Sequence, residues 1–389
     1  MSVWDDVVGQ EASVDVLRRA VTAAGQVLAG RPDPGMTHAW LFTGPPGSGR
    51  STAARAFAAA LQCEQGGCGT CHACRTVLAG THADVVLVAT ELVTIKIDEV
   101  RGLVQAAHRH PSQGRWRVVL VEDADRMTER TSNVLLKSVE EPPERTVWLL
   151  CAPSAEDVVQ TIRSRCRSVR LRVPPVEAVA DLLVRRDGVD VAMASFAARA
   201  AQSHVGLARR LARDEGARIR RQEVLRIALS VRDVAEAVLQ AGNLVDVATE
   251  EAAAATEERN AREKAALLHS LGAEGSATLP PALRAQVRAL EEDQKRREKR
   301  LRLDVLDRAL LDLLSVYRDV LVLQLGAGLE LVNAEHRADL EQLAQTWRPE
   351  DTLRRMEAIG RTRSTIGENP NVNLLLAVEA MAVHLTGAA

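Results

Sequence analysis

The chain has 389 residues, of which 46% are hydrophobic, and a formal net charge of −2. This length allows two or three domains, and the near balance of charges gives no general reason to expect an acidic or nucleic-acid partner. Aromatic residues make up only 2%, which argues against a surface that stacks single-stranded bases. No apolar run approaches the roughly 20 residues of a membrane span, and the first residues lack the pattern of a signal peptide. We therefore expect a cytoplasmic protein without a membrane partner.

A glycine-rich loop is the first candidate site in chain order. It follows the apolar run at 39–42 and precedes an alanine-rich helix expected at 53–61, the strand, loop and helix context of a phosphate-binding loop. Its glycines let backbone N–H groups point at phosphate oxygens, and Ser51 would hold Mg²⁺. Arg50 stands where such loops carry lysine, and its planar guanidinium binds phosphate with a different geometry from a compact lysine ammonium. The predicted nucleotide-contacting residues are Gly44, Gly47, Ser48, Gly49, Arg50, Ser51 and Thr52.

Four of the six cysteines lie close together in the next segment, at Cys63, Cys68, Cys71 and Cys74. In a reducing compartment this density favours a metal over disulfides, because four thiolates complete the tetrahedral shell of Zn²⁺. A complete shell predicts a structural site. His72 could replace one sulfur, and free thiols or an iron–sulfur cluster are the alternatives. We predict a zinc module at about 62–78.

Short apolar runs then alternate with helical patterns up to about residue 172. The runs at 85–88, 118–121 and 147–151 join those near Leu41 and at 169–171 in a predicted five-stranded parallel sheet covered on both faces. Glu122 and Asp123 follow one buried run, where carboxylates organise Mg²⁺ and water opposite a phosphate loop. Their order is the reverse of the usual Asp then Glu.

After the two prolines at 174–175, every segment has a helical pattern. Helices are expected at 176–186, 190–201 and 206–214, followed by longer ones to the C-terminus. Charged stretches at 250–260 and 287–302 predict two arms of a helical hairpin, joined by a turn or tip at 272–281. The hairpin is either a solvated structure or an arm that docks a partner.

Several motifs together resemble a protein family, the bacterial clamp-loader subunits of DNA polymerase III, which are AAA+ proteins. The resemblance covers roughly residues 1–215 and continues weakly at 369–379. Beside the loop and the cysteines, it rests on Trp4, Val8-Gly9-Gln10, Gly80-Thr-His-Ala-Asp84, the segment 133–143 and Ile162-Arg-Ser-Arg-Cys166. It implies an α/β AAA+ core at 1–172 with the zinc module as an insertion, a three-helix lid at 173–215, and a helical collar domain at 216–389 with the charged hairpin inserted at about 245–305.

Four positions at which this chain departs from the motor subunit separate two kinds of subunit within this family. The tau/gamma motor would carry lysine at Arg50, Asp-Glu at 122–123, a threonine where Ala152 and Pro153 stand, and a lid arginine where Gly206 stands. These four departures favour the stationary delta-prime subunit. Its nucleotide site would be degenerate, binding ATP or ADP with Mg²⁺ or nothing. Arg209 or Arg210 is an alternative lid arginine, in which case the chain is nearer to an active ATPase. A stand-alone zinc-containing AAA+ adaptor is a third hypothesis.

Arg165 lies in the triplet that, in this family, projects toward the ATP of the neighbouring subunit. The resemblance implies that Arg165 acts as an arginine finger in trans on tau/gamma. The alternative is a surface arginine in a basic loop with Arg163 and Arg167. The implied partners are tau/gamma and delta in a hetero-pentamer, and through that complex the β sliding clamp and primed template DNA. The sequence leaves open whether nucleotide is bound and which residues meet DNA.

Overall fold

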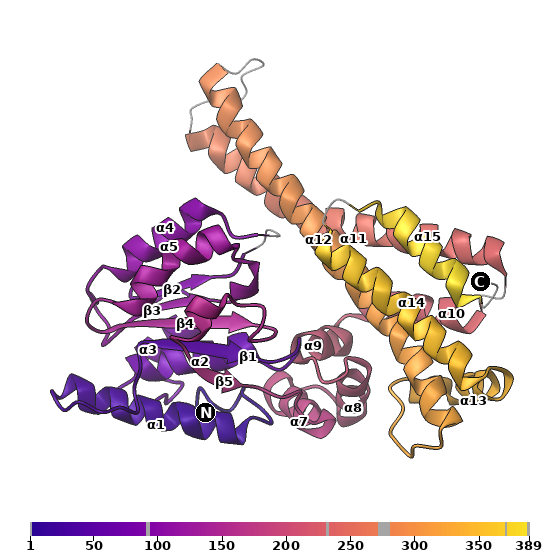
Figure 1. The fold of residues 1–389 in the computed structure, drawn as a ribbon, viewed down its shortest axis with the longest axis horizontal. Helices are drawn as coiled ribbons and strands as arrows, with labels where there is room; N and C mark the ends of the chain where they lie inside the picture. Colours follow the sequence, from indigo (N-terminus) through magenta and orange to yellow (C-terminus); the bar gives the residue numbers. More distant parts are fainter. Residues whose placement is uncertain (1, 91–93, 231–232, 271–280, 370–371, 387–389) are drawn as a thin grey trace. The chain divides into compact units, whose positions relative to one another are not determined.

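The computed structural model describes residues 2–90, 94–230, 233–270, 281–369 and 372–386. The chain divides into two compact units (Figure 1). The first contains Met1–Thr90 and Thr94–Arg213, and the second contains Asp214–Ala389. Within the described residues, no helix is both long and apolar enough to cross a membrane. The predicted boundary between core and lid near residue 172 falls inside the first unit and stays a prediction.

The first unit is built on a five-stranded sheet. Its strands are β1 (Ala39–Thr43), β2 (Val85–Val88), β3 (Arg117–Val121), β4 (Thr146–Ala152) and β5 (Arg167–Arg170), in the order β2-β3-β4-β1-β5. Each neighbouring pair is parallel. β1, β3 and β4 are buried along their whole length, which explains why they consist of continuous apolar runs. The predicted sheet is confirmed, although β5 begins two residues earlier than the apolar pattern indicates.

Helices cover the sheet on both sides, and two separate apolar clusters fill the layers. One cluster joins the sheet to α1 (Glu11–Leu28), α2 (Arg50–Gln62) and α3 (His72–Leu78). The other joins it to α4 (Ile97–Ala107) and α5 (Glu129–Glu140). In Figure 1 these two groups lie on opposite faces of the sheet. The predicted α/β core, a parallel sheet covered by helices on both faces, is confirmed.

The strand order determines where the candidate site lies. β4 stands between β3 and β1, and its end pairs with the end of β1 through Ala152 and Thr43. Because the strands are parallel, the segments that follow β1, β3 and β4 all leave the same edge of the sheet. The phosphate loop, the acidic pair and the end of β4 therefore meet at that edge.

Three short helices complete the first unit: α7 (Val176–Asp187), α8 (Val191–Ala200) and α9 (Val205–Arg213). They match the predicted helices within a residue or two. The side chain of Asp187 is 1% exposed and forms ion pairs of 3.0 Å with both Arg209 and Arg213. This buried carboxylate ties the end of α7 to α9.

The second unit is helical, as predicted. It contains α10 (Glu215–Ser230), α11 (Val234–Ser270), α12 (Pro281–Gln324), α13 (Arg337–Thr346), α14 (Pro349–Glu368) and α15 (Leu374–Leu385). One apolar cluster joins all six helices. The predicted arms at 250–260 and 287–302 are parts of α11 and α12, the two longest helices. Of the predicted turn at 272–281, residues 272–280 lie outside the described residues, and Pro281 begins α12.

The two arms are joined by a polar seam. Arg297 donates to both carboxylate oxygens of Glu263, at 2.9 and 2.6 Å. Gln294 donates to the backbone carbonyl of Asn260 at 3.0 Å, and Lys264 pairs with Glu291 at 2.7 Å. The hydrogen bonds from Arg297 lower the pKa of Glu263 to about 2.

Candidate functional site

The phosphate loop has the backbone geometry that its sequence predicts. Gly47 and Gly49 have φ angles of +86° and +84°, in the region that favours glycine. Gly49 precedes α2, and no side chain caps the first turn of that helix. The free N–H groups at this helix start are the elements with which such loops bind anions.

Arg50 does not extend away from the loop. Its Nη1 donates a hydrogen bond of 2.9 Å to the backbone carbonyl of Gly44, at the start of the same loop. The guanidinium is thus held against the protein's own backbone. A compact lysine ammonium would instead be free to approach the outer phosphates of a bound nucleotide.

The carboxylates after β3 are also engaged by protein groups. Glu122 Oε1 forms an ion pair of 2.7 Å with Arg55 Nε on α2, and the Glu122 side chain is only 13% exposed. Asp123 accepts a hydrogen bond from the backbone N–H of Thr90 at 3.2 Å and lies 3.6 Å from Arg126. An acid that serves Mg²⁺ or a water supplies its negative charge to them, and here Arg55 already pairs with one oxygen of Glu122, while Thr90 and Arg126 contact Asp123.

The end of β4 offers no hydroxyl to a nucleotide. Ala152 is fully buried, and the carbonyl of Pro153 accepts a hydrogen bond of 3.1 Å from the N–H of Gly44. Cys151, next to Ala152, is fully buried too, and burial raises the pKa of its thiol. This cysteine is a core residue.

The lid lies directly against the phosphate loop. A Cβ added to Gly47 would come within 2.9 Å of the Cα of His204, just before α9. Gly206 follows in the first turn of α9, and Arg209 is committed to Asp187 within the lid. Ser48 Oγ is buried and has no hydrogen-bond partner among the described residues.

The N-terminal strap, which we define as residues 2–10, also binds the loop. Gln10 donates to the backbone carbonyls of Ser48 at 3.2 Å and Arg172 at 2.6 Å, and it accepts a hydrogen bond of 3.0 Å from Arg172 N–H. Gly9 has a φ of +68°, and a Cβ there would lie 2.9 Å from Pro175. The Val-Gly-Gln motif therefore joins the loop to the chain that enters the lid.

The cysteine cluster has the geometry of a four-sulfur metal centre. The sulfurs of Cys63, Cys68, Cys71 and Cys74 all lie within 4.8 Å of one another. Cys63 is 3.7 Å from Cys68 and 3.8 Å from Cys71, measured between sulfurs. A tetrahedron with metal–sulfur bonds of about 2.3 Å has edges of about 3.8 Å, so a zinc ion fits this arrangement. Backbone N–H groups, chiefly those of Thr70 and Cys71, lower the pKa of Cys68 to about 6.

The cysteine-containing segment also binds the N-terminal strap. The N–H of Val3 donates to the carbonyl of Gly67 at 3.0 Å, and the indole of Trp4 donates to the carbonyl of Gly66 at 3.3 Å. A Cβ at Gly67 would approach Val3 to 2.6 Å, so only glycine fits this contact. The module therefore holds the strap that continues to the phosphate loop.

Arg165 lies between α6 (Gln160–Arg163) and β5, away from its own phosphate loop in sequence. It forms an ion pair with Glu140 at the end of α5 and donates to the carbonyl of Thr161 at 2.8 Å. Its side chain is 40% exposed. The adjacent Cys166 packs against the core, and burial raises the pKa of this thiol to about 12.

One structural residue of the family motifs was not assigned a role from the sequence. Asp84 is 1% exposed and accepts hydrogen bonds from the backbone N–H groups of Ser112, Gln113 and Gly114, at 2.6 to 2.8 Å. Burial alone would raise the pKa of this carboxyl, but these donors outweigh it and lower the pKa. Asp84 thus holds the loop before β3. Its place after Gly80-Thr-His-Ala is the only sequence signal for this role.

Comparisons with known proteins are consistent with this geometry. Residues 32–175 match the family model for the DNA polymerase III delta subunit, and residues 303–386 match the model for the C-terminal part of a delta subunit. The chain is 35% identical over 185 residues to the gamma/tau subunit of Mycobacterium tuberculosis, covering 46% of this chain and 30% of the relative. It is 38% identical over 154 residues to the delta-prime subunit of Pseudomonas aeruginosa, covering 38% of this chain and 47% of the relative.

The chain therefore spans less than half the length of these curated relatives. A solved gamma subunit-related protein from Thermotoga maritima aligns over 95% of this chain and 99% of its own, with 14% identity and a TM-score of 0.39. A score of that size supports no argument about function.

Proposed function

We propose that this chain, which is a DNA polymerase III subunit of the tau, gamma and delta-prime type, has the delta-prime role. In this proposal it is a stationary AAA+ subunit of the clamp loader, without ATP turnover of its own. It assembles with tau/gamma and delta subunits in a hetero-pentamer. That complex opens the β sliding clamp and places it on primed template DNA.

One observation supports the delta-prime role most directly: the two charged groups of the nucleotide site, Arg50 and Glu122, already bind other groups of this chain. Arg50 binds the carbonyl of Gly44, and Glu122 binds Arg55. Hydrolysis needs a cation on the outer phosphates and a carboxylate that organises Mg²⁺ and water. Releasing these groups would break contacts that the structure already makes. The site therefore fits bound nucleotide better than it fits turnover.

Arg165 is proposed to act on a neighbouring subunit. A guanidinium that meets the γ-phosphate from another chain stabilises the charge that develops during transfer. Arg165 is partly exposed and held through contacts to Glu140 and Thr161, all of which a neighbouring phosphate could replace. Until then, the carboxylate of Glu140 and the carbonyl of Thr161 hold the guanidinium beside the α6–β5 junction.

The cysteine cluster is proposed to hold a structural zinc ion. The four sulfurs complete the metal shell, so no position remains for a substrate. Its role is to fold the segment at about 62–78 and to hold the N-terminal strap through the carbonyls of Gly66 and Gly67.

The motor role is the second candidate, and the intact loop favours it. Gly47 and Gly49 keep the conformations of a working phosphate loop, and Ser51 retains the hydroxyl that would bind Mg²⁺. Under this alternative, nucleotide would displace Arg50 from Gly44 and restore the site.

The test is co-purification with tau/gamma and delta subunits, followed by measurement of ATP turnover by the purified chain alone. The delta-prime proposal expects a stable complex and no turnover above that of an Arg50→Ala/Glu122→Gln double variant. Turnover that this double variant abolishes supports the motor role. Failure to join the other subunits would contradict both roles and support a stand-alone adaptor.

A further inference from the structure

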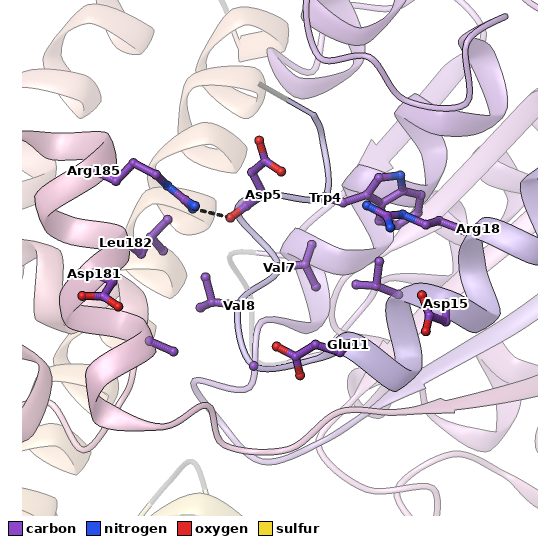
Figure 2. A pocket seen from close by; sticks show the side chains of 13 residues that line it. Trp4, Asp5, Val7, Val8, Glu11, Asp15, Arg18, Asp181, Leu182 and Arg185 are labelled. Carbon is purple, nitrogen blue, oxygen red and sulfur yellow. Dashed lines mark hydrogen bonds between the residues drawn. The ribbon is translucent and has the colours of Figure 1, made fainter.

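A pocket outside the nucleotide site opens between the N-terminal strap, the start of α1 and α7 (Figure 2). It has a volume of 400 Å³ and is lined by Trp4, Asp5, Val7, Val8, Gly9, Glu11, Val14, Asp15, Arg18, Ala178, Asp181, Leu182 and Arg185. No residue of the phosphate loop or the cysteine cluster lines it. Its volume lies within the range of about 300–1,000 Å³ that is usual for ligand pockets.

The floor of the pocket is apolar and closely packed. Val7 and Val14 are each 7% exposed, and Leu182 is 1% exposed. Figure 2 shows the Val7 and Val8 side chains on the strap and Leu182 on α7. An aliphatic chain of a few methylene groups would bury its surface against these side chains.

The rim is rich in carboxylates without partners. Glu11 and Asp15 on α1 and Asp181 on α7 are exposed, and none of their side-chain carboxylates has a hydrogen bond or ion pair to any described residue. Two cations also line the pocket. Arg185 donates to the backbone carbonyl of Asp5 at 2.6 Å, a neutral partner, so Arg185 and Arg18 both keep their charge. The carboxylates of Asp5, Glu11, Asp15 and Asp181 still outnumber these two guanidinium groups, so the lining is negative overall.

The walls are fixed before any ligand arrives. The strap is bound at one end to Gly66 and Gly67 and at the other end, through Gln10, to Arg172. Arg185 joins the strap to α7, as the dashed line in Figure 2 marks. A pre-formed pocket costs little ordering entropy when it binds.

We propose that this pocket is a docking site for a lysine or arginine side chain of a partner protein. The aliphatic stem would lie over Val7 and Leu182, and the cationic head would meet the carboxylates of Glu11, Asp15 and Asp181. Because those carboxylates stand on the exposed rim, the head stays near solvent while the stem is buried, as long basic side chains prefer. A lysine or arginine side chain combines an aliphatic stem with a cationic head, so its chemistry matches both the apolar floor and the acidic rim.

The first test uses the full chain with ¹³C-labelled valine and leucine methyl groups. The probe is N-acetyl-arginine methylamide, and its matched control is the citrulline analogue, which has the same shape but no charge. We expect the probe to shift the methyl signals of Val7, Val8 and Leu182 in a saturable manner. The citrulline analogue should bind at least tenfold more weakly, and the arginine probe should lose affinity between 50 and 500 mM salt, because exposed charges are screened.

Variants test whether the rim carboxylates bind the arginine probe. The triple variant Glu11→Gln/Asp15→Asn/Asp181→Asn should weaken probe binding at least tenfold. Glu177→Gln, which removes an exposed carboxylate from the same helix outside the pocket, should leave binding unchanged. If the triple variant does not fold, Asp181→Asn alone should still weaken binding several-fold. Equal shifts with the citrulline analogue, or equal binding by the variants, would overturn the proposal.

A photo-cross-linking arm tests the occupant. Benzoylphenylalanine placed at Val8 in the complex with tau/gamma and delta subunits should cross-link to a partner segment that contains lysine or arginine. No protein cross-link in the assembled complex would overturn a protein occupant. Saturable shifts with adenosine but not with the arginine probe would assign the pocket to a nucleoside instead.

Discussion

Replacement of Arg165 by alanine should separate the stability of the chain from the activity of its complex. The Arg165 and Glu140 side chains are 40% and 35% exposed. An ion pair exposed to this degree contributes about 0–1 kcal/mol, so Arg165→Ala should lower the free energy of unfolding by no more than about 1 kcal/mol. For a unit of this size the melting temperature should then fall by about 2–4 °C. Folding and assembly should remain intact.

The catalytic effect should be much larger at one neighbouring site. Arginine fingers contribute roughly 10³–10⁵ in rate, so a site without one contributes almost nothing to turnover. The steady-state ATP hydrolysis of the complex, with saturating clamp and primed DNA, should fall by the share of that site if the motor sites act independently. It should fall further if they are coupled.

Glu140→Gln is the matched control, because it removes the same ion pair but keeps the guanidinium. It should cost similar stability, and the complex should hydrolyse ATP at the wild-type rate or faster. If Arg165→Ala leaves hydrolysis unchanged, Arg165 is only a surface residue. If both variants lower hydrolysis equally, the ion pair has a structural role and the finger assignment is wrong.

Three further predictions concern the zinc site, Asp84 and the helical arms. The purified chain should contain one equivalent of zinc by elemental analysis, and an unmodified chain without zinc would contradict the site. Replacement of all four cysteines by serine should remove the zinc. It should also raise hydrogen exchange at residues 62–78 and leave hydrogen exchange in the sheet unchanged. Asp84→Ala should lower the free energy of unfolding at pH 7 by about 3 kcal/mol, because it leaves buried donors without a partner. Since the folded-state pKa of Asp84 is lowered, the stabilisation is present above the ordinary carboxyl pKa and is lost as the pH falls through the folded value. Urea unfolding should therefore show a smaller difference in unfolding free energy between the wild type and Asp84→Ala at pH 3 than at pH 7. An equal difference at both pH values would refute the argument. Arg297→Ala should return the pKa of Glu263 from about 2 toward its ordinary value, as measured by carboxyl ¹³C NMR; an unchanged pKa would mean that the seam does not form in solution.

Local sequence predicted the sheet and the arrangement of the cysteines for clear physical reasons. β1, β3 and β4 are buried on both faces, so their sequences are continuous apolar runs that hardly fit any other element. The cysteines lie within twelve positions, and their spacing alone brings the sulfurs together. The helices of the lid and the second unit followed from their periodicity and from the prolines that separate them from the sheet.

Sequence could not predict the partners of the charged groups. Arg55 and Glu122 are 67 positions apart, and Arg165 meets Glu140 only because α5 ends beside the α6–β5 junction. The hydrogen bond from Arg50 to Gly44 depends on a rotamer that no spacing encodes. The pocket beside the N-terminal strap was also missed, since its walls come from segments at least 160 positions apart.

The most direct measurement of the central claim is the rate of clamp loading by a reconstituted complex that carries Arg50→Ala in this chain. If the nucleotide site of this chain does not contribute to ATP hydrolysis, loading should remain within a few-fold of the wild-type rate. The reason is that a group contributes to rate only where it acts in the transition state. A collapse of loading, with the complex still fully assembled, would contradict the stationary role and identify the chain as a motor subunit.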